Sequence, residues 1–417
     1  YHVFAVLVFA AGMAVLPFIH LFMKNNSYSL SYIRVLYAMW LVRTVLSYLL
    51  TYRKSLLIAD QKEYIASITG LILNVVSYLA IILLVTWEQN YLLALGIGTV
   101  TEVVLNIWIS WYVEQKYPFL RQRRKEKSTS SLTKRIVRDL KSLFISRISE
   151  KMLYCTDNLI ISGFIGVGTV GRYANYCMIT QAISNILTIL ANTIQPTVGD
   201  YFTEKNRQRN YEILRQLTFG FFCIASVVSV GLFSLITPFV RDIWLGPSYE
   251  LGWGITVFCI VVLLVRIMGL PLSLVMGVTG LFEKEKNVGA SSALLNLIVS
   301  LALVKPYGMA GVLLGTLLSY LLQILYRYII YFRDFLEMPG EALRYAQDIG
   351  EYLAVIAGEV LLMQKIVPLI YGAGGMLLFC VCFLLCIAIP LLLDLVIFGR
   401  GWRLQSIVTM VKGMRKA

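Results

Sequence analysis

Two apolar stretches between residues 141 and 200 carry polar side chains at helical intervals. In the first, 143–165, ionisable and polar groups recur every three or four residues and so fall largely on one face of a helix. Its members are Arg147, Glu150, Lys151, Tyr154, Asp157 and Asn158. The second, 170–198, repeats the rhythm with neutral groups that include Tyr176, Gln181, Asn185 and Asn192.

Both stretches are long enough to cross a bilayer, which needs about 20 helical residues. An ionisable group that faces lipid there costs at least about 2.5–3.5 kcal/mol. We therefore expect the two polar faces to line a polar chamber inside a membrane bundle. The alternative is that Glu150 and Asp157 pair with Arg147 and Lys151 only to satisfy a buried helix contact. That alternative explains the double stripe poorly, since helix packing rarely needs so many polar side chains.

The composition requires a membrane around these stretches. The 417 residues are 58% hydrophobic and 14% charged, with a mean hydropathy of +0.75, unlike a soluble domain of this size. We predict an all-α integral membrane protein with twelve spans. They lie at about 3–23, 30–51, 64–86, 91–113, 141–165, 169–198, 215–240, 254–280, 287–304, 308–331, 346–369 and 373–398.

The basic residues gather in every second connection between these spans. The net charge of +14 therefore indicates membrane orientation and no nucleic-acid partner. The positive-inside rule places the loops near 53–62, 114–140, 205–209 and 284–286 in the cytoplasm, together with the C-terminal tail. The basic, Ser/Thr-rich segment 114–140 reads as a linker, and 399–417 as a basic amphipathic tail on the inner leaflet.

An internal repeat divides the chain into two halves. Short markers recur at separations of 221 to 223 residues, among them Pro17 with Pro238, Arg43 with Arg266 and Asn74 with Asn296. We predict an N-terminal lobe at 1–113, a C-terminal lobe of six spans at 141–332 and two extra spans at 333–398. At this offset the pair at 141–200 has no counterpart in the first lobe. Two spans are therefore expected ahead of residue 1, which gives fourteen in the intact protein.

Arginines within the spans suggest an anionic passenger. Arg34, Arg43 and Arg266 are expected to form a cationic cavity with Arg147 and Lys151, because the arginine fork suits phosphate. For Arg34, snorkelling to the membrane surface explains its position equally well.

The acidic residues of the spans have two readings. Glu102, Glu150 and Asp157 are candidate counter-ions for the arginines, or sites for a coupling cation. Glu359 and Asp394 in the last two spans are expected to serve helix pairing.

The chain shows no sign of enzyme chemistry. It has no phosphate-binding loop, nucleotide-binding motif or nucleophile elbow, and no connecting loop is large enough to form a catalytic domain. Its two histidines are both near the start, so the usual metal sites are not expected. We predict no cofactor, apart from Na⁺ or H⁺ as a coupling ion.

Four motifs resemble the polysaccharide-export flippases of the MOP (MATE-like) superfamily, the Wzx type of Gram-positive capsule and exopolysaccharide clusters. They are YRKSLLIADQK at 52–62, TDNLIISGFIG at 156–166, VGRYANY at 170–176 and IQPTVGD at 194–200. The resemblance extends over nearly the whole chain and weakens after about residue 340.

The resemblance implies a two-lobed, V-shaped bundle in the bacterial plasma membrane. It also implies transfer of an undecaprenyl-diphosphate-linked oligosaccharide repeat unit from the inner to the outer leaflet by alternating access. The diphosphate would sit in the cationic cavity, which Arg147 would face, while the lipid tail stays in the bilayer. The protein would act as a monomer among membrane lipids, with contact to glycosyltransferases or the polymerase of the pathway as a further expectation.

Two other functions compete with this one. A cation-coupled multidrug-type exporter of the same superfamily would favour acidic and aromatic cavity residues, so the arginines count against it. A membrane enzyme, such as a polymerase or acyltransferase, would need long exposed loops with Arg or His chemistry and would show no two-half repeat.

Overall fold

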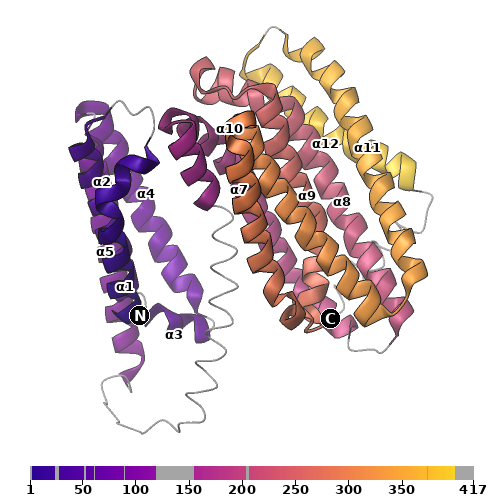
Figure 1. The fold of residues 1–417 in the computed structure, drawn as a ribbon, viewed down its shortest axis with the longest axis horizontal. Coiled ribbons are helices and arrows are strands. Elements are labelled where there is room, and N and C mark those ends of the chain that lie inside the picture. Colours follow the sequence, from indigo (N-terminus) through magenta and orange to yellow (C-terminus); the bar gives the residue numbers. More distant parts are fainter. Residues whose placement is uncertain are drawn as a thin grey trace. The chain divides into compact units, whose positions relative to one another are not determined.

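The computed structural model describes residues 2–23, 28–50, 53–60, 62–88, 90–118, 155–202, 206–372 and 374–399. Over these ranges the chain forms helices, turns and no strand (Figure 1). It divides into two compact units, Tyr1–Lys134 and Arg135–Ala417. The division falls within the segment predicted as the linker, and the finer domain boundaries stay predictions.

The first unit contains a short bundle of apolar helices. They are α1 (His2–Val15), the 3-10 helix η1 (Leu16–Phe22), α2 (Leu30–Leu50), α3 (Lys54–Ala59), α4 (Glu63–Glu88) and α5 (Tyr91–Lys116). α2 packs against α1 and α5, and α4 packs against α5. The Asn90 side chain starts α5 by accepting hydrogen bonds from the amides of Leu92 and Leu93. The outer face of α4 exposes Leu71, Val76 and other apolar residues, as a helix in contact with lipid does.

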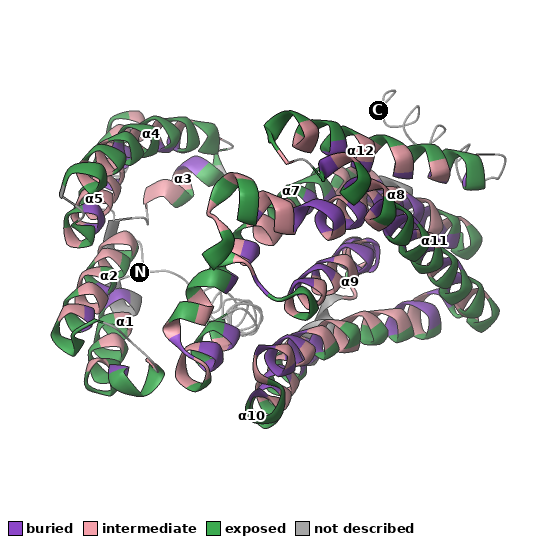
Figure 2. Ribbon diagram, turned by 90° about the horizontal axis from the view of Figure 1, so that it is seen from above, coloured by how far each residue is buried: buried purple, intermediate pink, exposed green. Residues whose placement is uncertain are grey.

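The second unit is larger and has the extended core. It begins with a helical segment at 155–164, followed by α7 (Val167–Tyr201), α8 (Arg207–Pro238), η4 (Phe239–Trp244) and η5 (Pro247–Tyr249). The remaining elements are α9 (Trp253–Val278), α10 (Phe282–Ile329), η6 (Ile330–Leu336), α11 (Pro339–Tyr371) and α12 (Met376–Phe398). α9 packs against α7, α8 and α10, while α8 also packs against α11 and α12. Buried residues gather on these central helices (Figure 2).

α10 is two helices joined at a kink. Gly308 has φ 58° and ψ −135°, a conformation that side-chain-bearing residues rarely adopt. The halves on either side then pack closely on each other. A Cβ at Gly311 would overlap the carbonyl of Leu303, and one at Gly315 would overlap the hydroxyl of Ser300. Small residues at these positions allow the close approach.

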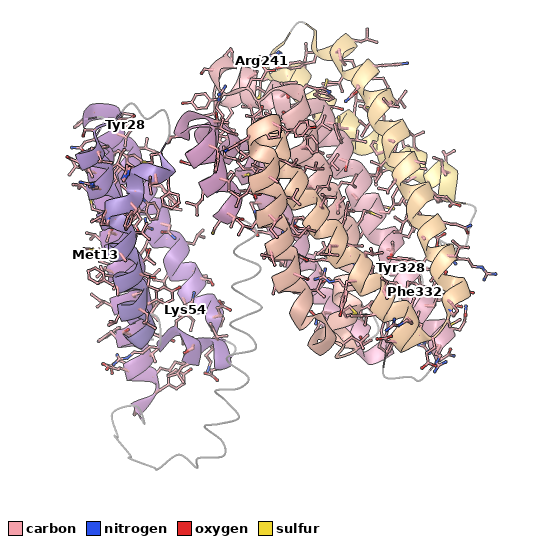
Figure 3. The ribbon with its side chains drawn as sticks, in the orientation of Figure 1. Met13, Tyr28, Lys54, Arg241, Tyr328 and Phe332 are labelled. Atoms are coloured by element: carbon pink, nitrogen blue, oxygen red, sulfur yellow. The ribbon has the colours of Figure 1, made fainter. Side chains whose placement is uncertain are left out.

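Aromatic residues close one end of the second unit. Tyr328 and Phe332 lie there with ring centroids 4.9 Å apart, at the end opposite to Arg241 (Figure 3). The Tyr328 hydroxyl donates to the carbonyl of Ala342 at 2.7 Å and so ties the end of α10 to the start of α11. This contact holds the C-terminal helices onto the core.

The structure confirms the predicted all-helical membrane fold. Nine of the described helices are long and apolar enough to cross a membrane. The predicted spans at 287–304 and 308–331 correspond to the two halves of α10. The predicted span at 30–51 corresponds to α2, which is not among the nine. For the predicted span 141–165, only the residues from 155 onward are described.

Candidate functional site

The predicted site residues fall into three groups in the structure. Arg147, Glu150, Lys151 and Tyr154 lie outside the described residues. Arg34, Arg43 and Glu102 belong to the first unit. The others belong to the second unit, where they occupy different surroundings.

Asp157 lies at the centre of a buried polar cluster. Its side chain projects from the helical segment 155–164, and the residue is only 4% exposed. The Thr316 hydroxyl donates to Asp157 Oδ2 at 2.7 Å, and Asn296 Nδ2 lies 3.4 Å from Oδ1. Asn296 and Thr316 come from the two halves of α10 and are themselves joined by a 2.9 Å hydrogen bond. The close packing at Gly315 allows Thr316 to reach the carboxylate.

Within the described residues, no arginine or lysine forms an ion pair with Asp157. A buried carboxylate without a counter-charge is costly, and it tends to be protonated or to bind a cation. The cluster offers carboxylate, amide and hydroxyl oxygens, the donor type that hard cations prefer. Asp157, Asn296 and Thr316 could therefore hold a small cation.

Asn296 and Thr316 are functional candidates that the sequence did not identify. Asn296 was noted only as a marker of the internal repeat, and Thr316 had no distinguishing spacing. The signal available in the sequence was the shared helical phase of small and polar residues in the second half of α10, Gly315, Thr316 and Ser319.

The predicted polar stripe of α7 divides between the surface and the core. Asn185 and Asn192 are exposed on the unit's surface, and Gln181 is half-buried. Their spacing of four and seven residues keeps them on one face, which helices of the second unit do not cover. Asn158, next to Asp157 in the chain, is exposed as well.

Tyr176 belongs to the packed interior. Its side chain is fully buried, and its hydroxyl accepts a hydrogen bond from the Leu251 amide at 3.2 Å. This contact anchors the segment that leads into α9. We therefore assign Tyr176 to packing, although its spacing grouped it with the cavity-lining residues.

Arg43 of α2 is paired with Glu102 of α5. Arg43 Nε lies 2.8 Å from Glu102 Oε2, and both side chains are about one-third exposed, at 30% and 32%. The guanidinium also lies over the Trp40 ring, 5.2 Å from its centroid. Gly98, one turn before Glu102, leaves room for the guanidinium, because a Cβ there would come within 3.1 Å of Arg43 Nη1.

Arg34 and Arg266 differ in their surroundings. Arg34 is exposed, near the start of α2. Arg266 is half-buried in the middle of α9, and its guanidinium carbon lies 5.4 Å from the ring centroid of Tyr320. A desolvated cation–π contact is worth up to about 2 kcal/mol, so the ring helps α9 to keep a charge inside the bilayer.

Comparisons with known proteins agree with this picture. The profile of a family described as "Polysaccharide biosynthesis protein" matches residues 2–202. The fold is similar to "Lipid II flippase MurJ, inward closed conformation", with a TM-score of 0.65 and 15% identity, over 95% of this chain and 82% of that chain. It is also similar to a mutant of the MATE transporter VcmN of Vibrio cholerae, with a TM-score of 0.50 and 12% identity, over 80% and 75% of the two chains. A comparison with curated proteins gives no match.

The shared helical architecture defines a multi-pass membrane protein of the flippase and MATE transporter fold. This architecture confirms the predicted fold, and the family match over residues 2–202 agrees with the predicted resemblance to polysaccharide-export flippases. The Gram-positive branch and the two spans expected ahead of residue 1 stay predictions.

Proposed function

We propose that this protein moves an undecaprenyl-diphosphate-linked oligosaccharide repeat unit from the inner to the outer leaflet for capsule or exopolysaccharide synthesis. The family match and the similarity to a solved lipid II flippase support a lipid-linked substrate. Both relatives are described as a flippase or a transporter, which favours transport over an enzymatic reaction.

The observation that carries the proposal is the uncovered polar face of α7. Asn185 and Asn192 are exposed on a helix long enough to cross the membrane. An amide that faces hydrocarbon loses its hydrogen bonds, at a cost of several kcal/mol (about 2–7 by reference state). The face therefore needs a polar partner. The hydroxyl groups of a sugar chain can donate hydrogen bonds to these amides and accept hydrogen bonds from them.

Arginines provide the complementary charge for a diphosphate. Arg266 is held within α9 by Tyr320, and Arg43 is held within α2 by Glu102. The Arg43–Glu102 pair is partly open, so a phosphate can compete with Glu102 for the guanidinium. Arg147 and Lys151, outside the described residues, are proposed to provide further positive charge for the diphosphate.

Asp157 is proposed as the coupling site. A Na⁺ ion or a proton bound among Asp157, Asn296 and Thr316 would neutralise the buried carboxylate and link α10 to the segment 155–164. Binding in one state and release in the other would drive alternating access, because a ligand shifts an equilibrium by its differential affinity for the two states.

The proposal is tested by locating the lipid-linked saccharide pool in cells depleted of the protein. We expect complete repeat units on undecaprenyl diphosphate to accumulate where an impermeant sugar-specific probe cannot reach them. An unchanged pool and unchanged capsule would overturn the substrate class and favour the multidrug-type exporter, for which drug efflux is the readout.

Variants of α7 connect the test to the structure. The double variant Asn185→Leu/Asn192→Leu should fail to restore the outer-leaflet pool while its amount in the membrane stays normal. Thr193→Val is the matched control, because the exposed Thr193 hydroxyl bonds only to its own helix at Ile189. Full activity of the double variant would remove the proposed role of this face.

A further inference from the structure

A second buried acidic site lies among α8, α11 and α12, apart from the Asp157 cluster. Glu359 of α11 is 3% exposed, and Asp394 of α12 is 4% exposed. The Ser226 hydroxyl of α8 donates to Glu359 Oε2 at 2.6 Å. Asp394 lies next to the same Ser226 hydroxyl, and its charge interacts with that of Glu359. Three helices thus bring two carboxyl groups and one hydroxyl to one point.

Three of the four oxygens of these carboxyl groups lack a hydrogen-bond donor among the described residues. Glu359 Oε1 and both oxygens of Asp394 are buried without a hydrogen-bond partner among the described residues. Ser226 has a single hydroxyl hydrogen, which Glu359 Oε2 already accepts. A buried acceptor without a partner destabilises the fold, and more so when it is charged. The site as it stands therefore lacks a positive charge or a hydrogen.

No basic side chain of the packed helices supplies that charge. Arg215 of α8 forms a bidentate ion pair with Asp348 of α11, with N–O distances of 2.6 and 2.9 Å. Lys365 of α11 is exposed to the surroundings of the bundle. The thiol of Cys223 on α8 also lies near both carboxyl groups, and it carries no positive charge.

We propose that Glu359 and Asp394 bind one shared proton, which makes this interface a proton-binding site. Asp394 carries the hydrogen as a carboxylic acid, next to the Ser226 hydroxyl that donates to Glu359 Oε2. One hydrogen then halves the buried negative charge of the pair. Like-charged carboxyl groups at close range share a proton for this reason, since both cannot ionise together.

The site is better suited to a proton than to a metal ion. Hard cations take many oxygen ligands, about six to eight for Ca²⁺. Two carboxyl groups and one hydroxyl provide fewer, and the surrounding side chains of this interface are mostly apolar.

Aromatic rings close the site toward the end of α12. Phe222 and Tyr352 stack with centroids 4.4 Å apart, and Phe398 packs edge-on against both. Phe222 is one turn from Ser226, and Phe398 is one turn from Asp394. The rings therefore shield the proton from that end of the bundle. With the proton bound, α11 and α12 pack on α8 with one buried negative charge and not two.

The test is infrared difference spectroscopy of the purified full chain, in H₂O and D₂O, with Asp157→Asn as the background. Among the described residues, that background removes a further buried carboxyl group without a cationic partner. We expect a carbonyl band of a protonated carboxylic acid that shifts on deuteration. Either Asp394→Asn or Glu359→Gln should abolish it, because the two residues share the one proton. Asp348→Asn should leave it intact, because Asp348 is paired with Arg215.

Amide variants mimic the protonated acids in shape, so we expect them to fold, with unchanged melting midpoints in detergent as the check. Absence of the band, or its persistence in both variants, would overturn the proposal. So would a melting midpoint that rises with Na⁺ in the background protein and not in Asp394→Asn, since it would identify a metal-ion site. None of these readouts involves transport, so the result is independent of the proposed flippase function.

Discussion

Acidic side chains within the spans are neutralised in different ways. Glu102 and Asp348 each face an arginine, at 2.8 and 2.6 Å. Asp157 instead accepts hydrogen bonds from neutral groups, and neither oxygen of Asp394 has a geometrically formed hydrogen bond among the described residues. The paired carboxylates have an arginine as counter-charge, whereas Asp157 and Asp394 are proposed to depend on a bound ion or proton. The residues that lack a partner in the protein are therefore the ones expected to respond to ions.

Asp157→Asn should uncouple transport from the ion gradient. The amide keeps a hydrogen-bonding group of the same shape beside Asn296 and Thr316 but removes the charge that attracts a cation. We expect uptake or flipping in reconstituted vesicles to fall by at least about tenfold, or about 1.4 kcal/mol, under an inward Na⁺ or H⁺ gradient.

Asp348→Asn is the control for this measurement, because it also removes a buried carboxylate but lies in an ion pair with Arg215. If Asp157→Asn kept the full gradient dependence, Asp157 would be assigned to structural pairing between helices.

For single residues, the sequence predicted which positions in the spans are polar, but it did not predict which other residues they contact. Tyr176 and Asn185 lie on the same helix with similar polarity, yet one is buried against Leu251 and the other is exposed. The helical period gives each residue's direction around the axis, but which direction is covered depends on α9, whose placement comes from tertiary packing.

At the scale of the elements, the two halves of α10 can stay packed together only if residue 311 is small enough to contact the Leu303 backbone. Gly311→Ala should destabilise the protein by about 1–3 kcal/mol, because the added methyl group overlaps the Leu303 carbonyl and the two half-helices must separate. Thermal unfolding in detergent measures the effect.

Gly220→Ala in α8 is the matched control. A Cβ there meets nothing within 4 Å, so the substitution should be neutral or stabilise the helix by about 0.5–1 kcal/mol. Equal melting midpoints for the two variants would show that the halves of α10 are not held by this contact.

The helices themselves were largely predictable. Long apolar stretches gave the span positions, and the boundaries of α4, α5 and α12 agree with the predicted spans within a few residues. The break between the spans at 287–304 and 308–331 was visible in the sequence, where Pro306 and Gly308 interrupt the apolar stretch. What the sequence could not give was the close contact of the two halves, which depends on the conformation of Gly308.

For the whole molecule, the placement of basic residues predicts one orientation in the membrane. In a background without the seven native cysteines, Ser248→Cys in η5 should react with an impermeant maleimide added to intact cells. Ser130→Cys, in the basic segment 114–140, should react only after permeabilisation. Labelling of Ser130→Cys from outside would reverse the predicted topology.

The repeat markers and the basic segment predict two halves, because both are properties of order along the chain, and the division into two units falls within that basic segment. The identity of the passenger was not accessible in this way. Arg43 and Arg266 indicate an anion, but one arginine is compensated by Glu102 and the other rests on Tyr320. Charge counted along a sequence does not show which charges remain available.

The Arg43–Glu102 pair also has a consequence for biosynthesis. α2 is synthesised 59 residues before its counter-charge, and an unpaired arginine at the centre of a span raises the insertion free energy by about 2.5–3.5 kcal/mol. α2 therefore reaches the translocon before Glu102, the counter-charge of Arg43, has been synthesised. Its residence in the bilayer is completed only when α5 emerges, so the helices of the first unit must integrate as a group and not one by one.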